Sequence, residues 1–171
     1  ESNQGSAKDY IEYITAGGGT NIIDGLRTSL DQMEYSQERV PVIVFLTDGL
    51  PTFGPIQDTM EIRSDIRSRN DQGTSIYSLG FGHDLDFEFL RALSLENDGF
   101  AVDIPEGQDA SMLMSDFYDT ISTPLAKNLE FDYSIGTFDV IPTRIPSLHE
   151  GSEAVIVGRF DPEIETIKSD V

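Results

Sequence analysis

The stretch VIVFLTDGLPTFG, residues Val42 to Gly54, decides the fold of this chain. Its apolar run from Val42 to Leu46 is too short for a helix and too uniformly apolar for a strand that is half exposed to solvent. We therefore predict a central strand that is buried on both faces, as the strands of a parallel sheet are. The run stops at Asp48, and a turn rich in Gly and Pro follows it.

Helical and strand periods alternate on either side of this strand through the first three quarters of the sequence, which is typical of a parallel sheet covered by helices. Asn21 is placed to cap the helix that follows it, with Asp24 as the acid of a capping box. In the helix predicted over residues 57–69, we expect Met60, Ile62 and Ile66 to face inward. The complete prediction has five helices, marked by apolar residues at 7–14, 22–33, 57–69, 87–93 and 112–121, and three parallel strands at 42–46, 75–79 and 100–102.

The period changes after Pro124. Alternate residues from Leu129 to Ile135 are apolar, and Ala154 to Phe160 is a second extended segment that follows a predicted turn at residues 150–152. We expect antiparallel strands that lie outside the parallel sheet. The predicted fold class is therefore α/β, with part of a doubly wound parallel sheet and a C-terminal antiparallel β extension. The predicted domains are residues 1–125 for the α/β part and residues 126–171 for the extension.

The charge balance excludes one class of partner. The 171 residues include 31 acidic and 11 basic side chains, which gives a formal net charge of −20 at pH 7. Nucleic-acid binding requires clustered Lys and Arg, so we expect no nucleic-acid partner. No stretch approaches the roughly 18 consecutive apolar residues of a membrane-spanning helix. The chain has no cysteine, which excludes disulfide bonds and thiolate metal sites.

Two oxygen-bearing side chains are candidates for a ligand site. Asp48 follows the predicted central strand, and ligands of open parallel sheets bind at the carboxyl ends of the strands. A hard divalent cation such as Mg²⁺ prefers oxygen ligands, and both Asp48 and the hydroxyl of Thr20 suit it. Taken singly, Asp48 is better interpreted as a turn carboxylate beside Gly49, and Thr20 as part of the helix cap next to Asn21. Taken as a pair in this order, they favour a metal site.

Two further candidates are weaker. His83, Asp84 and Asp86 cluster after Gly82 and could hold a metal, but an aspartate cap on the following helix is the favoured interpretation. His149 is interpreted as a solvated turn residue.

Four motifs follow one another in a specific order. They are GGGTNIIDGL (Gly17 to Leu26), VIVFLTDGLPTFG, IYSLGFGHDLDFEFLRALSLENDGFA (Ile76 to Ala101) and FYDTISTPL (Phe117 to Leu125). Together they resemble the von Willebrand factor type A domain, and within it the inter-alpha-trypsin inhibitor heavy-chain family. The resemblance covers about residues 7–125, and SEAVIVGRF at 152–160 resembles the strand segment that follows the domain in that family.

The resemblance implies a metal-ion-dependent adhesion site. In the family an Asp-x-Ser-x-Ser loop after the first strand, a later Thr and a later Asp hold the cation, and Thr20 and Asp48 match the last two. It therefore implies Mg²⁺, or Mn²⁺ or Ca²⁺, in the intact domain. No Asp-x-Ser-x-Ser occurs in this sequence, so we expect the domain's first strands to precede Glu1 and cation binding by this chain to be weak or absent. The rim that would meet a partner is formed by Gly18, Gly19, Asn21, Gly49, Leu50 and Pro51.

The missing strand has a structural consequence. In this family the strand at Val42 to Leu46 pairs with the first strand, so one of its edges is expected to lack a partner here. A second copy of the chain, a separately cleaved N-terminal piece or the segments after Leu129 could cover that edge. We favour an intermolecular solution, which includes a homo-oligomer.

The sequence leaves three functions to consider for this chain. The resemblance implies an extracellular or cell-surface protein-binding module of the adhesion type, in which an acidic residue of the partner completes the shell of the cation. A metal-dependent hydrolase or phosphotransferase with Asp48 as nucleophile would need a second carboxylate two residues later or a poised base, and that position holds Leu50. We therefore expect no enzyme. A purely structural scaffold domain of a surface protein is the third hypothesis.

Overall fold

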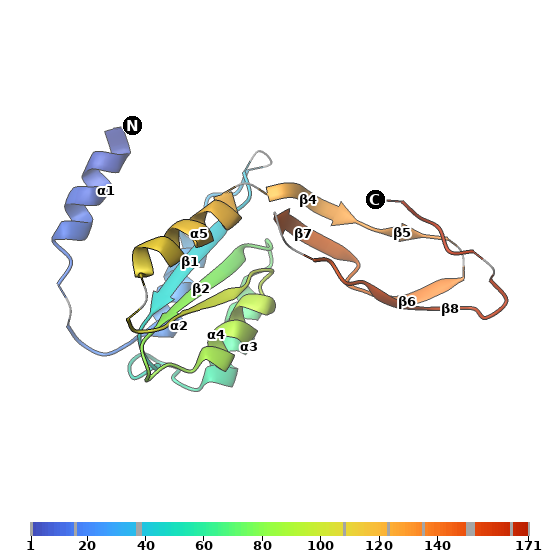
Figure 1. Ribbon diagram of the computed structural model, residues 1–171. Coiled ribbons are helices and arrows are strands. Elements are labelled where there is room, and N and C mark those ends of the chain that lie inside the picture. Colours follow the sequence, from blue (N-terminus) through green and yellow to red (C-terminus); the bar gives the residue numbers. More distant parts are fainter. Residues whose placement is uncertain are drawn as a thin grey trace.

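The structure is a computed structural model that describes residues 2–15, 17–36, 39–107, 109–122, 124–134, 136–149, 153–164 and 166–170. It comprises an N-terminal helix, an α/β body at residues 17–122 and a β extension at residues 124–170 (Figure 1). The helices are α1 (Ser2–Glu12), α2 (Ile22–Asp31), α3 (Thr59–Arg69), α4 (Phe87–Leu95) and α5 (Ala110–Ser122). The strands are β1 (Val42–Thr47), β2 (Ser75–Phe81), β3 (Ala101–Ile104), β4 (Pro124–Glu130), β5 (Asp132–Tyr133), β6 (Thr137–Ile141), β7 (Arg144–His149), β8 (Val157–Phe160) and β9 (Ser169–Asp170).

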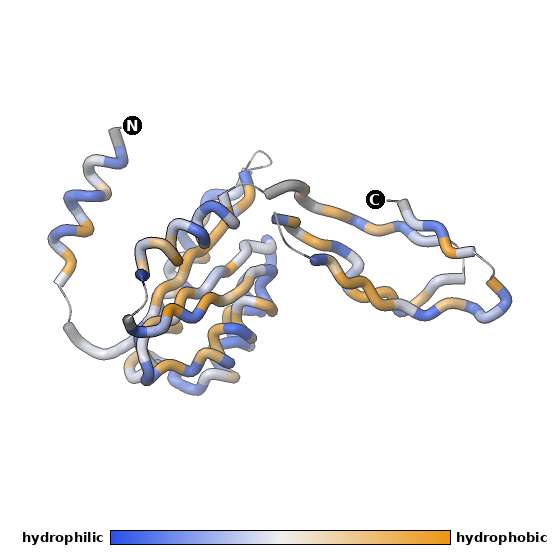
Figure 2. Tube along the Cα trace, in the orientation of Figure 1, coloured by the Kyte–Doolittle hydropathy of each residue, from blue (hydrophilic) through white to orange (hydrophobic). Residues whose placement is uncertain are grey.

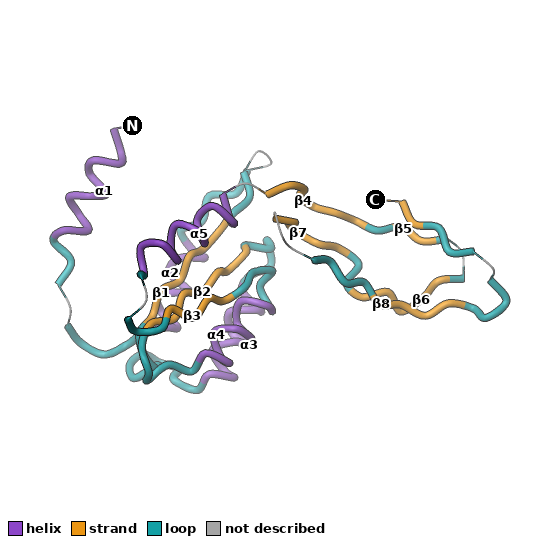
Figure 3. Tube along the Cα trace, viewed as in Figure 1, coloured by secondary structure: helices purple, strands orange, loops and turns teal. Residues whose placement is uncertain are grey.

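The body is built on a parallel sheet with the order β1-β2-β3 (Figure 3). Strand β2 lies in the middle. On one side, Val42 to Thr47 of β1 align with Ser75 to Gly80 of β2, and on the other side Ala101 of β3 aligns with Ser78 of β2. The predicted α/β class, the three parallel strands and the five helices are confirmed.

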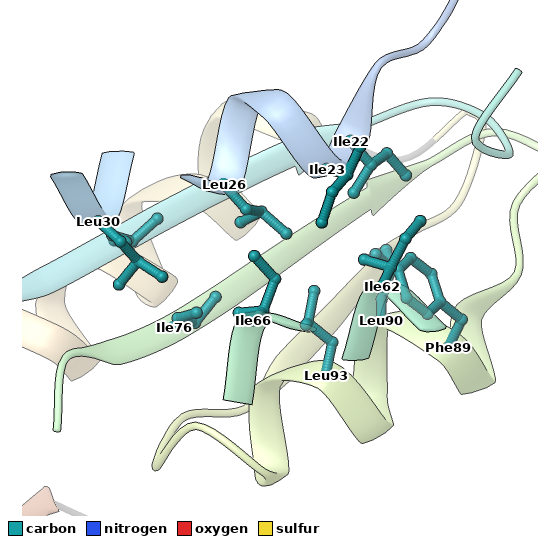
Figure 4. Close-up of a cluster of buried hydrophobic side chains, with 11 residues drawn as sticks. Ile22, Ile23, Leu26, Leu30, Ile62, Ile66, Ile76, Phe89, Leu90 and Leu93 are labelled. Carbon is teal, nitrogen blue, oxygen red and sulfur yellow. The ribbon is translucent and has the colours of Figure 1, made fainter. Parts of the chain in front are cut away.

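Alternate residues of β2 face two different helix layers. Ile76 packs with α2, α3 and α4 on one face, whereas Tyr77 and Leu79 pack with Phe117 of α5 on the other. Burying each large aliphatic side chain between the sheet and the layer of α2, α3 and α4 stabilises the fold by about 1.5–3 kcal/mol. Figure 4 shows this larger cluster, which consists of Ile22, Ile23, Leu26, Leu30, Ile43, Ile62, Ile66, Ile76, Phe89, Leu90 and Leu93.

Side-chain caps fix where the helices begin. Asn21 accepts a hydrogen bond from the Asp24 amide at 3.2 Å, and its own side-chain amide donates to the Asp24 carboxylate at 2.8 Å, which confirms the predicted cap. Asp58 accepts bonds from the amides of Met60 and Glu61. Helix α3 therefore starts at Thr59, slightly later than the sequence pattern indicates.

Two burial predictions are wrong. Strand β1 is buried on one face, but Val44 and Leu46 are 41% and 48% exposed because α5 packs over β2 and β3 on the other face. Met60 is 73% exposed, whereas Ile62 and Ile66 are buried. Two residues along a helix correspond to a rotation of about 200°, so Met60 and Ile62 lie on nearly opposite sides of α3.

The outer edge of β1 has no paired strand among the residues described above. The extension does not cover it, because the strands of the extension pair with one another. Among the described residues, the segments after Leu129 therefore do not cover the edge, although the sequence made them one of three solutions.

Helix α1 stands apart from the body in Figure 1. Tyr10 and Ile11 are 72% and 64% exposed, and Ile14 beyond the helix end is 62% exposed. The predicted opening helix is therefore present, and its apolar side chains face solvent.

The β extension consists of three antiparallel ladders, β4–β7, β5–β9 and β6–β8. This confirms the predicted antiparallel character of the region. Figure 2 shows hydrophobic residues along both the body and the extension. Ile135 and the predicted turn at 150–152 lie outside the described residues. No helix in the described ranges is long and apolar enough to cross a membrane.

Candidate functional site

Thr20 lies in a loop that is bonded to the loop after β1. The amides of Thr52 and Phe53 both donate to the Thr20 carbonyl, at 3.0 and 3.1 Å. The Thr20 amide donates to the Thr52 hydroxyl at 2.9 Å. These three hydrogen bonds hold Thr20 against the loop that follows Asp48.

The same arrangement places the Thr20 hydroxyl beside the Asp48–Gly49 turn. A Cβ atom added to Gly49 would lie 3.8 Å from Thr20 Oγ1. Asp48 itself follows the last residue of β1 and is exposed to solvent. The Thr20 hydroxyl thus lies close to Gly49, the residue after Asp48, at the carboxyl end of β1.

The rim of this edge is formed by tightly packed loops. A Cβ atom on Gly19 would come within 3.0 Å of Phe53 Cβ, and one on Gly54 within 2.2 Å of Asn21 Oδ1. Asn21 is occupied as the helix cap, Gly18 has a φ of 81°, and Pro51 is half-buried. Leu50 and Phe53 expose 48% and 62% of their surface, which gives the rim an apolar component.

Thr52 and Phe53 were not predicted as part of this site. Their contribution depends on the contact between two loops, and nothing in the local sequence pattern signals it.

A hollow of about 410 Å³ lies on the other side of Asp48, at the carboxyl ends of the three strands. Two exposed side chains approach each other in this hollow, with His83 Nε2 3.6 Å from Glu106 Oε2. Its lining residues are Asp48, Phe81, Gly82, His83, Asp84, Ile104, Pro105, Glu106, Gly107 and Ala110. Glu106 was not predicted from the sequence.

The donor set fits part of a cation shell. No group of three or more His, Asp or Glu side chains in the described residues is arranged to hold a metal ion. Asp48 offers one carboxylate and Thr20 one hydroxyl, and Mg²⁺ in proteins combines a few such oxygens with water. These two side chains alone do not complete a site.

Asp86 accepts a hydrogen bond from the Phe89 amide at 2.9 Å, so it caps α4, as the favoured interpretation had it.

Strong ion pairs lie instead in the helix layer. Arg27 donates two hydrogen bonds to Asp65, at 2.9 and 2.6 Å, and this pairing lowers the pKa of the Asp65 carboxyl. A hydrogen bond from Arg63 likewise lowers the pKa of Glu96. The first pair joins α2 to α3 and the second joins α3 to the end of α4, so their role is to hold the helices together.

The structure corrects the interpretation of His149 as a solvated turn residue. It is 8% exposed, and its Nε2 lies 3.1 Å from the hydroxyl oxygen of Tyr77, so it is not a solvated turn residue. The two residues are 72 positions apart, and they meet because β7 pairs with β4 and ends over β2.

Comparison with known proteins agrees with this architecture. The model of the von Willebrand factor type A domain matches residues 1–116. The chain is 35% identical over 165 residues to inter-alpha-trypsin inhibitor heavy chain H2 of Sus scrofa, covering 92% of this chain and 18% of the relative. It is 36% identical over 170 residues to heavy chain H6 of Homo sapiens, covering 94% and 13%.

The chain thus spans less than a fifth of the length of these two relatives. A solved structure described as von Willebrand factor type A from Catenulispora acidiphila superposes with a TM-score of 0.58 at 17% identity, and the match covers 92% of this chain and 38% of the other. That likeness shows a shared fold. The matched family model covers well over half of the residues, and the chain belongs to the von Willebrand factor type A domain family.

Proposed function

We propose that this chain is a protein-binding module of the adhesion type, and that its binding edge lies at the carboxyl end of β1 and uses a divalent cation. The observation that carries the proposal is the position of the Thr20 hydroxyl beside the Asp48–Gly49 turn. The type A family supports it, because domains of this family are typically protein-binding modules.

In this proposal the chain supplies part of the cation shell. Asp48 contributes a carboxylate and Thr20 a hydroxyl, and residues outside these 171 contribute the remaining protein oxygens. When bound, Mg²⁺, or Mn²⁺ or Ca²⁺ in its place, supplies a positive centre that accepts a carboxylate of the partner. A net charge of −20 would otherwise repel an acidic partner.

The rim supplies contact area around this centre. Gly18 and Gly19 are exposed and Gly49 is partly exposed, and the exposed side chains of Leu50 and Phe53 offer apolar surface to a partner. The core of a protein–protein interface is usually more apolar than its rim and is enriched in aromatic side chains.

We propose that this chain is not an enzyme. Leu50 occupies the position of a second acid, and the His83 imidazole faces Glu106 and is open to solvent. We further propose that the domain boundary lies between residues 125 and 126. The family resemblance supports an extracellular or cell-surface location. On the outer edge of β1 we propose a strand from another segment or from a second copy of the chain.

Paramagnetic relaxation by Mn²⁺ tests the cation site on the chain itself. At high ionic strength, where diffuse binding to the acidic surface is screened, sub-stoichiometric Mn²⁺ should broaden the NMR amide signals of residues 18–21 and 47–51 first. Asp48→Asn should abolish this local broadening, and Thr20→Val should weaken it. Asp116→Asn, at an exposed position on α5, is the matched control and should change nothing. Uniform broadening that Asp48→Asn leaves unchanged would exclude the site and favour a structural scaffold.

A second experiment tests the proposed completion of the shell. A synthetic peptide with an apolar strand followed by an Asp-x-Ser-x-Ser loop is added in trans. The Mn²⁺ affinity should rise by at least about tenfold, because each added oxygen ligand replaces water in the shell. An unchanged affinity, with peptide binding shown independently, would contradict this part of the proposal.

A further inference from the structure

The β extension contacts the body near the amino ends of the sheet strands, at the end opposite Asp48 (Figure 1). Tyr77, the third residue of β2, and His149, the last residue of β7, are 2% and 8% exposed. A polar ring in such a buried position requires a hydrogen-bond partner, and Tyr77 provides one at 3.1 Å.

His149 completes an aromatic cluster that joins β7, β2, α5 and the residue before β3. Its ring meets Tyr77 edge to face, with centroids 6.2 Å apart and an interplanar angle of 79°. Tyr77 also makes edge contacts with Phe100 at 4.9 Å and with Phe117 at 6.1 Å. Such edge-to-face pairs each contribute about 0.5–1.5 kcal/mol beyond the burial of their area. The extension is therefore joined to the layer formed by α5 and the sheet.

The other end of β7 also reaches the body. Arg144, its first residue, has a guanidinium nitrogen 3.3 Å from the position of a Cβ atom on Gly73. Burial raises the pKa of the Asp98 carboxyl, and the positive charge of Arg144 opposes this shift. Gly73 and Asp98 belong to the turns that precede β2 and β3, so both ends of β7 contact the same side of the body.

The covalent connection is short as well. Helix α5 ends at Ser122 and β4 starts at Pro124, which leaves one residue between the body and the extension. Two parts of a chain that are joined by a single connection usually move relative to each other unless further contacts prevent it. Here the contacts of His149 and Arg144 provide two additional attachment points.

We infer that Tyr77 and His149 form a latch that holds the β4–β7 ladder at one angle to the body. The extension then keeps a fixed orientation relative to the edge that carries Asp48, and a force or a partner acting on the extension is transmitted to the body. This inference concerns the geometry of the chain and does not depend on cation binding.

Distance measurements between two spin labels test the latch. The chain has no cysteine, so Ser64→Cys in α3 and Glu163→Cys in the extension, both at exposed positions, give a uniquely labelled pair. We expect one narrow distance distribution in the otherwise unchanged chain. His149→Ala should make it roughly twofold wider, because the extension then keeps only its covalent connection and the contact of Arg144. His83→Ala, at an exposed histidine, is the control and should leave it unchanged.

Amide exchange of β2 shows in the same samples whether the body remains folded. If His149→Ala is folded and keeps the narrow distribution, the latch is refuted. If His149→Ala does not fold, Tyr77→Phe decides in its place, since it removes one oxygen atom and keeps both rings. A wider distribution in Tyr77→Phe then supports the latch, and an unchanged one refutes it.

Discussion

The α/β body and the β extension bury their apolar side chains to very different extents. In the body, two clusters fill both faces of the sheet, and residues such as Leu26 and Ile66 are fully buried. In the extension, Ile141 is 71% exposed and Val157 is 65% exposed. Among the residues of the extension whose side-chain burial the structure describes, His149 is the one that is buried, and it contacts Tyr77 of the body.

The difference shows where the stability of the chain originates. A sheet with helices on both faces buries enough apolar area to fold as a unit, whereas two-stranded ladders are marginal in water without a layer to pack on. We therefore expect the extension to depend on its contacts with the body, or on a partner that covers its apolar residues.

The largest effect is expected from a matched pair of isoleucines. Ile66→Ala in the body leaves a cavity at a fully buried position and should lower the free energy of unfolding by about 2–5 kcal/mol. Ile141→Ala in the extension should change it by less than about 0.5 kcal/mol, because that side chain is already exposed. Chemical denaturation followed by circular dichroism measures both. Equal losses at the two positions would show that the body and the extension share one core.

The next largest effect is expected at Gly80 of β2. A Cβ atom there would lie 2.1 Å from Leu85 Cδ2 and 3.1 Å from Leu90 Cδ1, so Gly80→Ala should cost about 1–3 kcal/mol of stability through overpacking. Gly25→Ala in α2 is the matched control. Nothing lies within 4 Å of that position, and the substitution should stabilise the helix by about 0.5–1 kcal/mol. Denaturation midpoints that move in the same direction would contradict the packing shown for β2.

A smaller effect is expected for the ion pair between Arg63 and Glu96. Glu96→Gln should lower the free energy of unfolding by about 1 kcal/mol at pH 7, since the pair is partly exposed. The pKa of Glu96 is lowered in the folded chain, so the stabilisation is present above its unfolded pKa and is lost as the pH falls through the folded value. The difference between Glu96→Gln and the unchanged chain should therefore narrow below about pH 4. A constant difference down to pH 2 would contradict this account.

The smallest effect is expected for an ion pair of the extension. Arg159 Nη1 lies 3.4 Å from Asp139 Oδ2, and both side chains are more than half exposed. Arg159→Ala should leave the thermal midpoint unchanged within error, because such surface pairs contribute little. A clear decrease would show that the extension contributes more to stability than its burial indicates.

Local signals in the sequence predicted most of the body. The apolar run at Val42 to Leu46 identified a sheet strand, and Asn21 with Asp24 identified the start of a helix, because each pattern determines structure within a few residues. The exposure of Val44 and Leu46 was missed because it depends on where α5 packs. The burial of His149 was missed because its partner lies 72 residues away.

Only part of the candidate site was predicted from the sequence, for a similar reason. Thr20 and Asp48 were selected from the order of the motifs, and the structure places the Thr20 hydroxyl beside Gly49. Their role in cation binding stays a prediction. Thr52, Phe53 and Glu106 were missed because loops bring them to the edge, and loop conformation leaves no periodic signal.

Native-state hydrogen exchange tests most directly whether the body carries the stability of this chain. The amides of residues 76–79 in β2 should exchange through global unfolding, with a dependence on denaturant that matches the whole transition. The amides of residues 137–141 and 157–160 should exchange through a separate opening of lower free energy. Equal protection in β2 and in the β6–β8 ladder would contradict the account and would show that the two regions unfold as one.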